Sequence, residues 1–338
     1  MERQIDFIKN INQLISLLKE NQLLMRDKQQ QFLTQVVVVL IIIAAVCIIY
    51  EKADNNYSLK LNRVLQQTKS SNYQVGIPIV QSLKNQEWVE VFRDDFNGTK
   101  LNTTIWTARN NMTHGSWEQQ LYQSDDVYVE NGNLVLRTRF NPQKYIPSGR
   151  LYNYTSGWVD SQGKFSYKYG YAEARILFSK IVKNDPIWPA FWSIGENTYW
   201  PNGGEIDTME MSTQWGTNGN PKIWGTYHWG KTDQCNGCGS QFTGNLDFSE
   251  YHTYTTVWNE TQIYWYVDGI HYKTNVNGTT YPNTKSPLIL PNYSQYFIIN
   301  DALWGTPEPN PSDYPKYMYI DYVRVLQTKE TFEKQQKK

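Results

Sequence analysis

The chain has 338 residues, enough for one large domain with attached segments. Its 32 Lys and Arg residues balance its 32 Asp and Glu residues, so charge gives no indication of nucleic-acid binding. All 13 Trp residues fall between Trp88 and Trp304, which predicts a separate, aromatic-rich globular unit in that span. We expect some of these rings to fill its core and others to stack on sugar rings in a cleft.

Residues 1–31 form a mixed, largely polar tail that is predicted to be cytosolic and in part helical. Its apolar residues recur at heptad-like spacing, and Gln22 and Gln29 complete the series. The pattern fits either a short coiled coil that forms a homodimer or an amphipathic helix lying on a membrane. The apolar positions are Ile8, Ile11, Ile15, Leu18, Met25 and Phe32.

Residues 32–50 are predominantly apolar, and these 19 residues approach the roughly 20 that span a bilayer. A cleaved signal peptide would need a short basic leader, whereas 31 mixed residues precede this stretch. We therefore predict a single transmembrane helix, a signal-anchor, followed by a polar stem over residues 51–86. Arg26 and Lys28 place the N-terminus in the cytosol, so the chain is predicted to be a single-pass type II membrane protein.

Eight Asn-X-Ser/Thr sequons follow the apolar stretch and none precedes it. This one-sidedness suits a glycoprotein whose main domain is lumenal or extracellular. The predicted glycosylation sites are Asn56, Asn97, Asn102, Asn111, Asn153, Asn259, Asn277 and Asn292.

Cys235 and Cys238 form a CxxC sequence in a Gly-rich loop, while Cys47 lies within the apolar stretch. A zinc site would need two further ligands, of which nearby His228 supplies at most one. We favour a local disulfide, which an oxidising lumen permits.

Residues 87–328 consist mainly of strand-like runs separated by turn residues, with little helical periodicity. One run, residues 262–267, ends at Asp268-Gly269, a strong hairpin signal. A length of about 240 residues suits an all-β, two-sheet β-sandwich better than a small barrel. Residues 329–338 are predicted to be a polar tail.

The segment Gly203–Met211 places three carboxylates within six residues. Side chains alternate faces along a strand, so Glu205 and Asp207 share a face while Glu210 would lie on the other. One β-bulge between Asp207 and Glu210 would bring all three to one face. The two Glu side chains could then approach the separation of about 5–5.5 Å that a retaining glycosidase requires. A third acid nearby would raise the pKa of the general acid.

The order of several segments resembles glycoside hydrolase family 16, the concanavalin-like jelly rolls that include laminarinases. The resemblance covers roughly residues 88–327. It is carried by Phe92–Gly98, Thr155–Trp158, Gly163–Phe165, Tyr169–Arg175, Trp188–Trp192, Glu205–Glu210, His252–Tyr254 and Trp265–Gly269.

The resemblance implies a retaining endo-glycosidase that acts on a β-glucan, with β-1,3-glucan as the leading substrate. Glu205 would be the nucleophile, Glu210 the acid/base, and Asp207 a group that tunes the nucleophile. Double displacement by carboxylates requires no cofactor. A transglycosylase that remodels wall polysaccharide would use the same acids, and a non-catalytic β-glucan sensor is the alternative from another functional class.

Several aromatic residues are candidates for substrate binding, with core packing as the alternative for each. Trp188, Trp192 and Trp200 flank the acids in the sequence, and His228 and Trp229 lie in a segment that resembles the histidine-containing segment of the family. The resemblance also implies a structural calcium ion in some members, for which the matching residues are Asp95 and Asp321.

Overall fold

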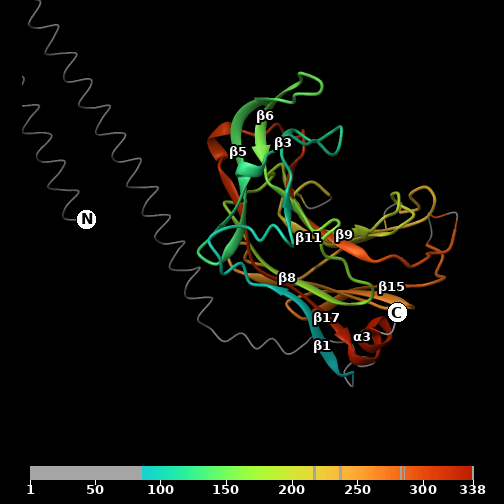
Figure 1. The fold of residues 1–338 in the computed structure, drawn as a ribbon. Coiled ribbons are helices and arrows are strands. Elements are labelled where there is room, and N and C mark those ends of the chain that lie inside the picture. The colour runs from blue at the N-terminus through green and yellow to red at the C-terminus, as the bar shows by residue number, and fades with distance from the viewer. Residues whose placement is uncertain (1–85, 216–217, 236–237, 282–283, 285, 337–338) are drawn as a thin grey trace, which may run out of the picture. The chain divides into compact units, whose positions relative to one another are not determined.

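The computed structural model describes residues 86–336 apart from 216–217, 236–237, 282–283 and 285 (Figure 1). Within this part of the chain, no helix is long and apolar enough to cross a membrane. The predicted tail helix, membrane anchor, stem and sequon Asn56 lie outside the described residues, so they remain predictions.

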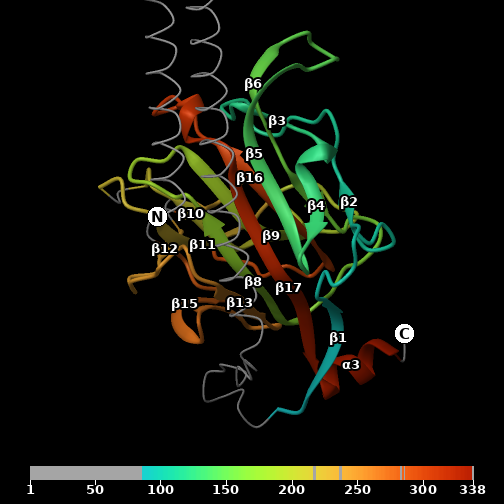
Figure 2. The same ribbon diagram turned by 90° about the vertical axis from the view of Figure 1, so that its left-hand side faces the viewer.

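The described residues form two β-sheets, as the alternating strand-like runs predicted. The first has ten strands, in the order β15-β14-β13-β8-β17-β5-β6-β3, with β1 paired to β17 and β4 to β5. These strands are β1 (Trp88–Asp94), β3 (Gln120–Tyr122), β4 (Val127–Glu130), β5 (Asn133–Lys144), β6 (Leu151–Ser156), β8 (Gly170–Ser179), β13 (His252–Trp258), β14 (Gln262–Val267), β15 (Ile270–Val276) and β17 (Lys316–Thr328). In both ribbon views the hairpin that joins β5 to β6 projects beyond the rest of the domain (Figure 2).

The second sheet has seven strands, in the order β12-β11-β10-β9-β16-β7-β2. They are β2 (Thr107–Ala108), β7 (Trp158–Asp160), β9 (Ile187–Gly195), β10 (Glu205–Ser212), β11 (Lys222–His228), β12 (Ser240–Gln241) and β16 (Gln295–Leu303). Ile206 and Met211 of β10 belong to one hydrophobic core with Ala174 and Ile176 of β8. The two sheets therefore share a core, and the fold is the predicted all-β sandwich.

The predicted polar tail is helical over most of its length. Helix α3 (Lys329–Gln336) follows β17 directly. The Lys329 backbone N–H donates to the Glu87 carbonyl, and a Glu330–Lys334 ion pair spans one helical turn. Such i,i+4 pairs stabilise a short helix, and the bond to Glu87 ties this one to the start of β1.

The sequons in the described part of the chain lie mainly at the surface. Asn97, Asn102, Asn153, Asn277 and Asn292 are exposed, and the remaining two, Asn111 and Asn259, are half-buried. Their glycosylation remains a prediction.

Trp229 lies in the core, which corrects its assignment as a substrate-binding residue. Its side chain is 1% exposed, and its ring stacks on that of Tyr227 with centroids 5.8 Å apart. Because side chains alternate faces, directing His228 outward turns both of its neighbours inward.

Trp229→Ala should lower the free energy of unfolding by about 3–5 kcal/mol, because it removes a fully buried indole from a packed core. Trp200→Ala should lower it by about 1 kcal/mol or less, since Trp200 is 52% exposed. Urea denaturation of the full-length chain, followed by circular dichroism, would measure both. Equal losses would contradict the placement of Trp229 in the core.

Candidate active site

The acid-bearing strand β10 contains the predicted bulge. Its pairing register shifts between Asp207 and Glu210 against β11, and between Asp207 and Met209 against β9. The Thr208 hydroxyl lies 3.1 Å from that of Thr256 in the other sheet, and Met209 belongs to the core. Two consecutive side chains therefore face inward, which returns Glu210 to the face that carries Glu205 and Asp207.

The opposite sheet supports this bulge through a buried indole. Trp265 of β14 donates its Nε1–H to the Asp207 carbonyl at 2.8 Å. A bulge removes a backbone group from the regular ladder, and a buried carbonyl without a partner is costly. The Trp265 side chain supplies that partner from across the core.

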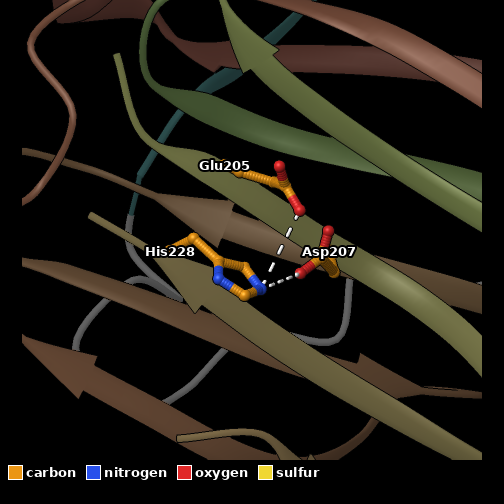
Figure 3. Close-up of side chains that lie close together, drawn as sticks. All are labelled: Glu205, Asp207 and His228. Carbon is orange, nitrogen blue, oxygen red and sulfur yellow. Dashed lines mark ion pairs between the residues drawn. The ribbon is translucent and has the colours of Figure 1, made fainter. Parts of the chain in front are cut away.

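His228 lies beside two of the acids (Figure 3). It pairs in register with Glu205 across β10 and β11. Its Nε2 is 3.5 Å from Asp207 Oδ2 and 3.9 Å from Glu205 Oε1. Its other nitrogen, Nδ1, is 2.9 Å from Asp233 Oδ2. The ring thus lies between Asp233 on its Nδ1 side and Asp207 and Glu205 on its Nε2 side.

Glu210 occupies a buried, hydrogen-bonded position. Trp188 Nε1–H donates to its Oε1 at 3.2 Å, and the Thr226 hydroxyl donates to its Oε2 at 2.9 Å. Burial raises the pKa of Glu210 to about 6, while the His228 charge and the Thr226 hydrogen bond limit the increase. Glu210 can therefore carry a proton at mildly acidic pH and release it near neutrality.

Asp207 and Glu205 have different surroundings. Burial raises the pKa of Asp207 well above its usual range, and the charges of Glu205 and Glu210 raise it further. A protonated Asp207 can donate a hydrogen bond to Glu205. Glu205 is also held by Trp200, whose Nε1–H donates to its Oε2 at 2.6 Å. The three acids therefore have three distinct environments on one face of the sheet.

These groups open into a cleft of about 820 Å³. Trp188, Trp192 and Trp200, the predicted substrate-binding residues, all line it together with Glu205, Glu210 and His228. Its wall also contains residues that sequence reasoning did not assign to substrate binding: His114, Trp117, Trp215 and Trp224.

One of the missed residues could have been found from the sequence. Trp224 lies four positions before His228 on the same strand, and residues at an even offset share a face of the sheet. Two of the lining indoles pack against Trp304: Trp188 stacks on it with centroids 4.6 Å apart, and Trp117 stacks on it at 6.4 Å. Flat apolar surfaces of this kind suit the C–H faces of sugar rings.

Cys235 and Cys238 are joined in a disulfide, the pairing that the sequence favoured, with Cα atoms 5.3 Å apart. Both residues contribute to the cleft lining, together with Asp233 and Gly239. The disulfide is therefore part of the cleft wall.

The two acids considered for calcium are each engaged by an arginine. Arg93 pairs with Asp95 and Arg175 with Asp321, both at 2.7 Å. Calcium needs six to eight oxygen ligands, and a guanidinium on each acid does not fit such a site.

Among the described residues, one group of His, Cys, Asp or Glu side chains has spacing compatible with a metal: Glu205, Asp207 and His228, whose ligand atoms lie within 4.8 Å. Metal ligands must be deprotonated, whereas burial raises the pKa of Asp207 well above its usual range and so opposes its ionisation. We interpret this group as an acid–imidazole cluster.

Sequence comparison identifies the family. The model of "Glycosyl hydrolases family 16" matches residues 114–323. The glucan endo-1,3-beta-glucosidase A1 of Niallia circulans is 32% identical over 264 residues, which cover 70% of this chain and 37% of that protein. The chain thus spans little more than a third of the length of that relative.

Solved structures agree with this match. The laminarinase catalytic domain of Thermotoga maritima is similar with a TM-score of 0.57 and 27% identity, covering 72% of this chain and 99% of that one. A structure described with endo-acting O-glycanases of the human gut microbiota that initiate mucin breakdown has a TM-score of 0.60 and 30% identity, covering 73% and 93%. Since the family match takes in most of the sandwich and the bulged strand with its three acids, the chain belongs to glycosyl hydrolases family 16.

Proposed function

We propose that this chain is a retaining endo-glycosidase that hydrolyses a β-glucan, with β-1,3-glucan as its leading substrate. The observation that carries the proposal is the set of three acids on one face of β10, each in a different environment, beneath an indole-lined cleft. The printed names of the Niallia and Thermotoga relatives support the choice of substrate.

The reaction would proceed by double displacement. The Glu205 carboxylate attacks the anomeric carbon while Glu210 gives its proton to the leaving oxygen, which cleaves the glycosidic bond and leaves a glycosyl ester on Glu205. Glu210 then takes a proton from water, and that water displaces Glu205. Asp207 would donate a hydrogen bond to Glu205, and the His228 cation would offset the negative charge of the cluster.

Transglycosylation is a second candidate because the cleft wall is strongly apolar. The stacked indoles of Trp117, Trp304 and Trp188 would bind a sugar acceptor better than water. The carboxylate chemistry would be the same, with a sugar hydroxyl in place of water in the second step.

We also propose, from the sequence alone, that residues 32–50 anchor the domain as a type II membrane protein with its sequons in the lumen or outside the cell. Enzymatic removal of N-glycans should then increase the gel mobility of the chain made in a eukaryotic secretory pathway. An unchanged mobility would contradict this topology.

The substrate is tested by offering the full-length chain laminarin, lichenan, xyloglucan, agarose and mucin O-glycans in parallel. We expect short oligosaccharides from laminarin, and none from Glu205→Gln, which keeps the shape of the side chain and removes its charge. Products longer than the starting chains would indicate transglycosylation. Binding without a change in chain length would contradict the proposal and favour a sensor.

The roles of the acids can be tested by chemical rescue. Glu205→Ala should abolish turnover, and added azide should partly restore it by attacking the anomeric carbon from the vacated side, giving a glycosyl azide of inverted configuration. Asp207→Asn should reduce kcat less severely, because Asn can still donate a hydrogen bond. A rescued product of retained configuration, identified by NMR, would contradict the assignment of Glu205.

Glu210 must be protonated to act as the acid, so kcat/KM should fall as pH rises through about 6. Thr226→Val removes a donor that stabilises ionised Glu210, which should raise the pKa and move this falling limb to higher pH. Thr256→Val, a hydroxyl deletion in the opposite sheet, serves as the control and should leave the limb in place. A limb that stays fixed or moves to lower pH in Thr226→Val would count against Glu210 as the acid.

A further inference from the structure

The loop between β11 and β12 carries Asp233, Cys235 and Cys238, all of which line one end of the cleft. We propose that Asp233 is a positioning residue, which orients His228 against the acids and is itself held in place by the Cys235–Cys238 disulfide. The inference rests on the proposed function and adds a redox-sensitive support to it.

The two carboxylate oxygens of Asp233 have different partners, one on the His228 ring and one on the loop backbone. Oδ2 lies 2.9 Å from His228 Nδ1, and Oδ1 accepts the Cys235 backbone N–H at 2.9 Å. A carboxylate on Nδ1 keeps a proton there and fixes the plane of the ring. Nε2 is consequently directed at Asp207 and Glu205, as the close-up shows (Figure 3).

Covalent and polar contacts fix the loop on both sides of Asp233. The N–H of Gln234, the residue directly after Asp233, donates back to the carbonyl of Trp229, which precedes Asp233, at 3.1 Å. After Asp233, the disulfide joins Cys235 to Cys238, whose carbonyl accepts from Lys273 Nζ at 3.0 Å.

Lys273 also ties this loop to the strand beside it. Its buried Nζ donates to the Gly225 carbonyl at 2.7 Å. Gly225 lies between Trp224 and Thr226, both of which line the cleft. The disulfide thus cross-links Cys235, whose N–H bonds to Asp233, directly to Cys238, whose carbonyl is tied to β11 through Lys273. Reducing it would free the Cys235 end of the loop, on which Asp233 depends.

Asp233 affects the charge of His228, and that charge acts on the acids. The charged or titratable groups around this ring are Asp233 from the loop, Glu205, Asp207 and Glu210 from β10, and Lys273 from β15 behind the strand. Burial lowers the pKa of His228, but the Asp233 hydrogen bond and the charge of Glu205 outweigh it, so the net shift is upward. The positive charge that His228 carries when protonated favours the ionised forms of the neighbouring carboxyls.

Asp233→Asn in the full-length chain tests the proposal, because it keeps the size of the side chain and removes its charge. With a weaker positive charge on His228, the pKa of Glu210 should rise, because that charge lowers it, so the falling limb of the kcat/KM–pH profile should move to higher pH. We expect kcat to fall about tenfold or more and KM to change about threefold or less. A general loosening of the loop would lower kcat without moving this limb to higher pH.

The chain offers a matched control in a second His–Asp pair. Asp268 Oδ2 lies 2.6 Å from His252 Nδ1, and neither residue is among those that line the cleft. Asp268→Asn should leave kcat and the falling limb unchanged. An Asp233→Asn profile that coincides with wild type would overturn the proposal.

The disulfide is tested by reduction with a phosphine and by the double variant Cys235→Ser, Cys238→Ser. Both should shift the falling limb in the same direction as Asp233→Asn, and reductant should have no further effect on the double variant. An unchanged falling limb in the double variant would overturn the role of the disulfide.

A readout without substrate separates this inference from the proposed function. Diethyl pyrocarbonate modifies neutral imidazole, and mass spectrometry can follow its reaction at His228 as a function of pH. His228 should react at lower pH in Asp233→Asn than in wild type. A wild-type chain without hydrolytic activity would contradict the proposed function, whereas identical reactivity of the two chains would overturn the positioning role of Asp233.

Discussion

The bulge in β10 is the constraint on which the rest of the site depends. A regular strand would direct Glu210 into the core, where an unpaired carboxylate is costly. Turning both Thr208 and Met209 inward places Glu210 on the outer face instead. The Trp265 indole supplies a hydrogen bond to the Asp207 carbonyl beside the bulge. The ten-stranded sheet therefore contributes to the active site without forming any of the cleft surface there.

Once the acids share a face, their neighbours give them different properties. Burial raises the pKa of Asp207 well above its usual range, and it raises the pKa of Glu210 to about 6. Glu205 is held by an exposed indole, that of Trp200, at the edge of the cleft. A nucleophile and an acid can coexist at one pH only if such differences separate them. His228 lies where its charge acts on the acids, and Asp233 orients its ring.

Much of this arrangement could be predicted from residue patterns. Strand-like runs and turn residues gave the sandwich, and the five-residue offset between Glu205 and Glu210 required the bulge. Burial could not be predicted in the same way, since Trp229 and Trp200 both flank the site in sequence and only strand register separates core from cleft. The role of Asp233 depends on the path of a loop, which has no periodicity to read. Helix α3 forms from a polar segment because it is tied to the start of β1, a contact between the two ends of the domain.

The most direct test of the central claim is the anomeric configuration of the first product formed from laminarin. Proton NMR of the reaction at early times, before mutarotation, distinguishes the two anomers. Two carboxyl groups that act in succession through a glycosyl ester on Glu205 predict the β-anomer. An initial α-anomer would mean direct attack by water, and the assignment of Glu205 as the nucleophile would be wrong.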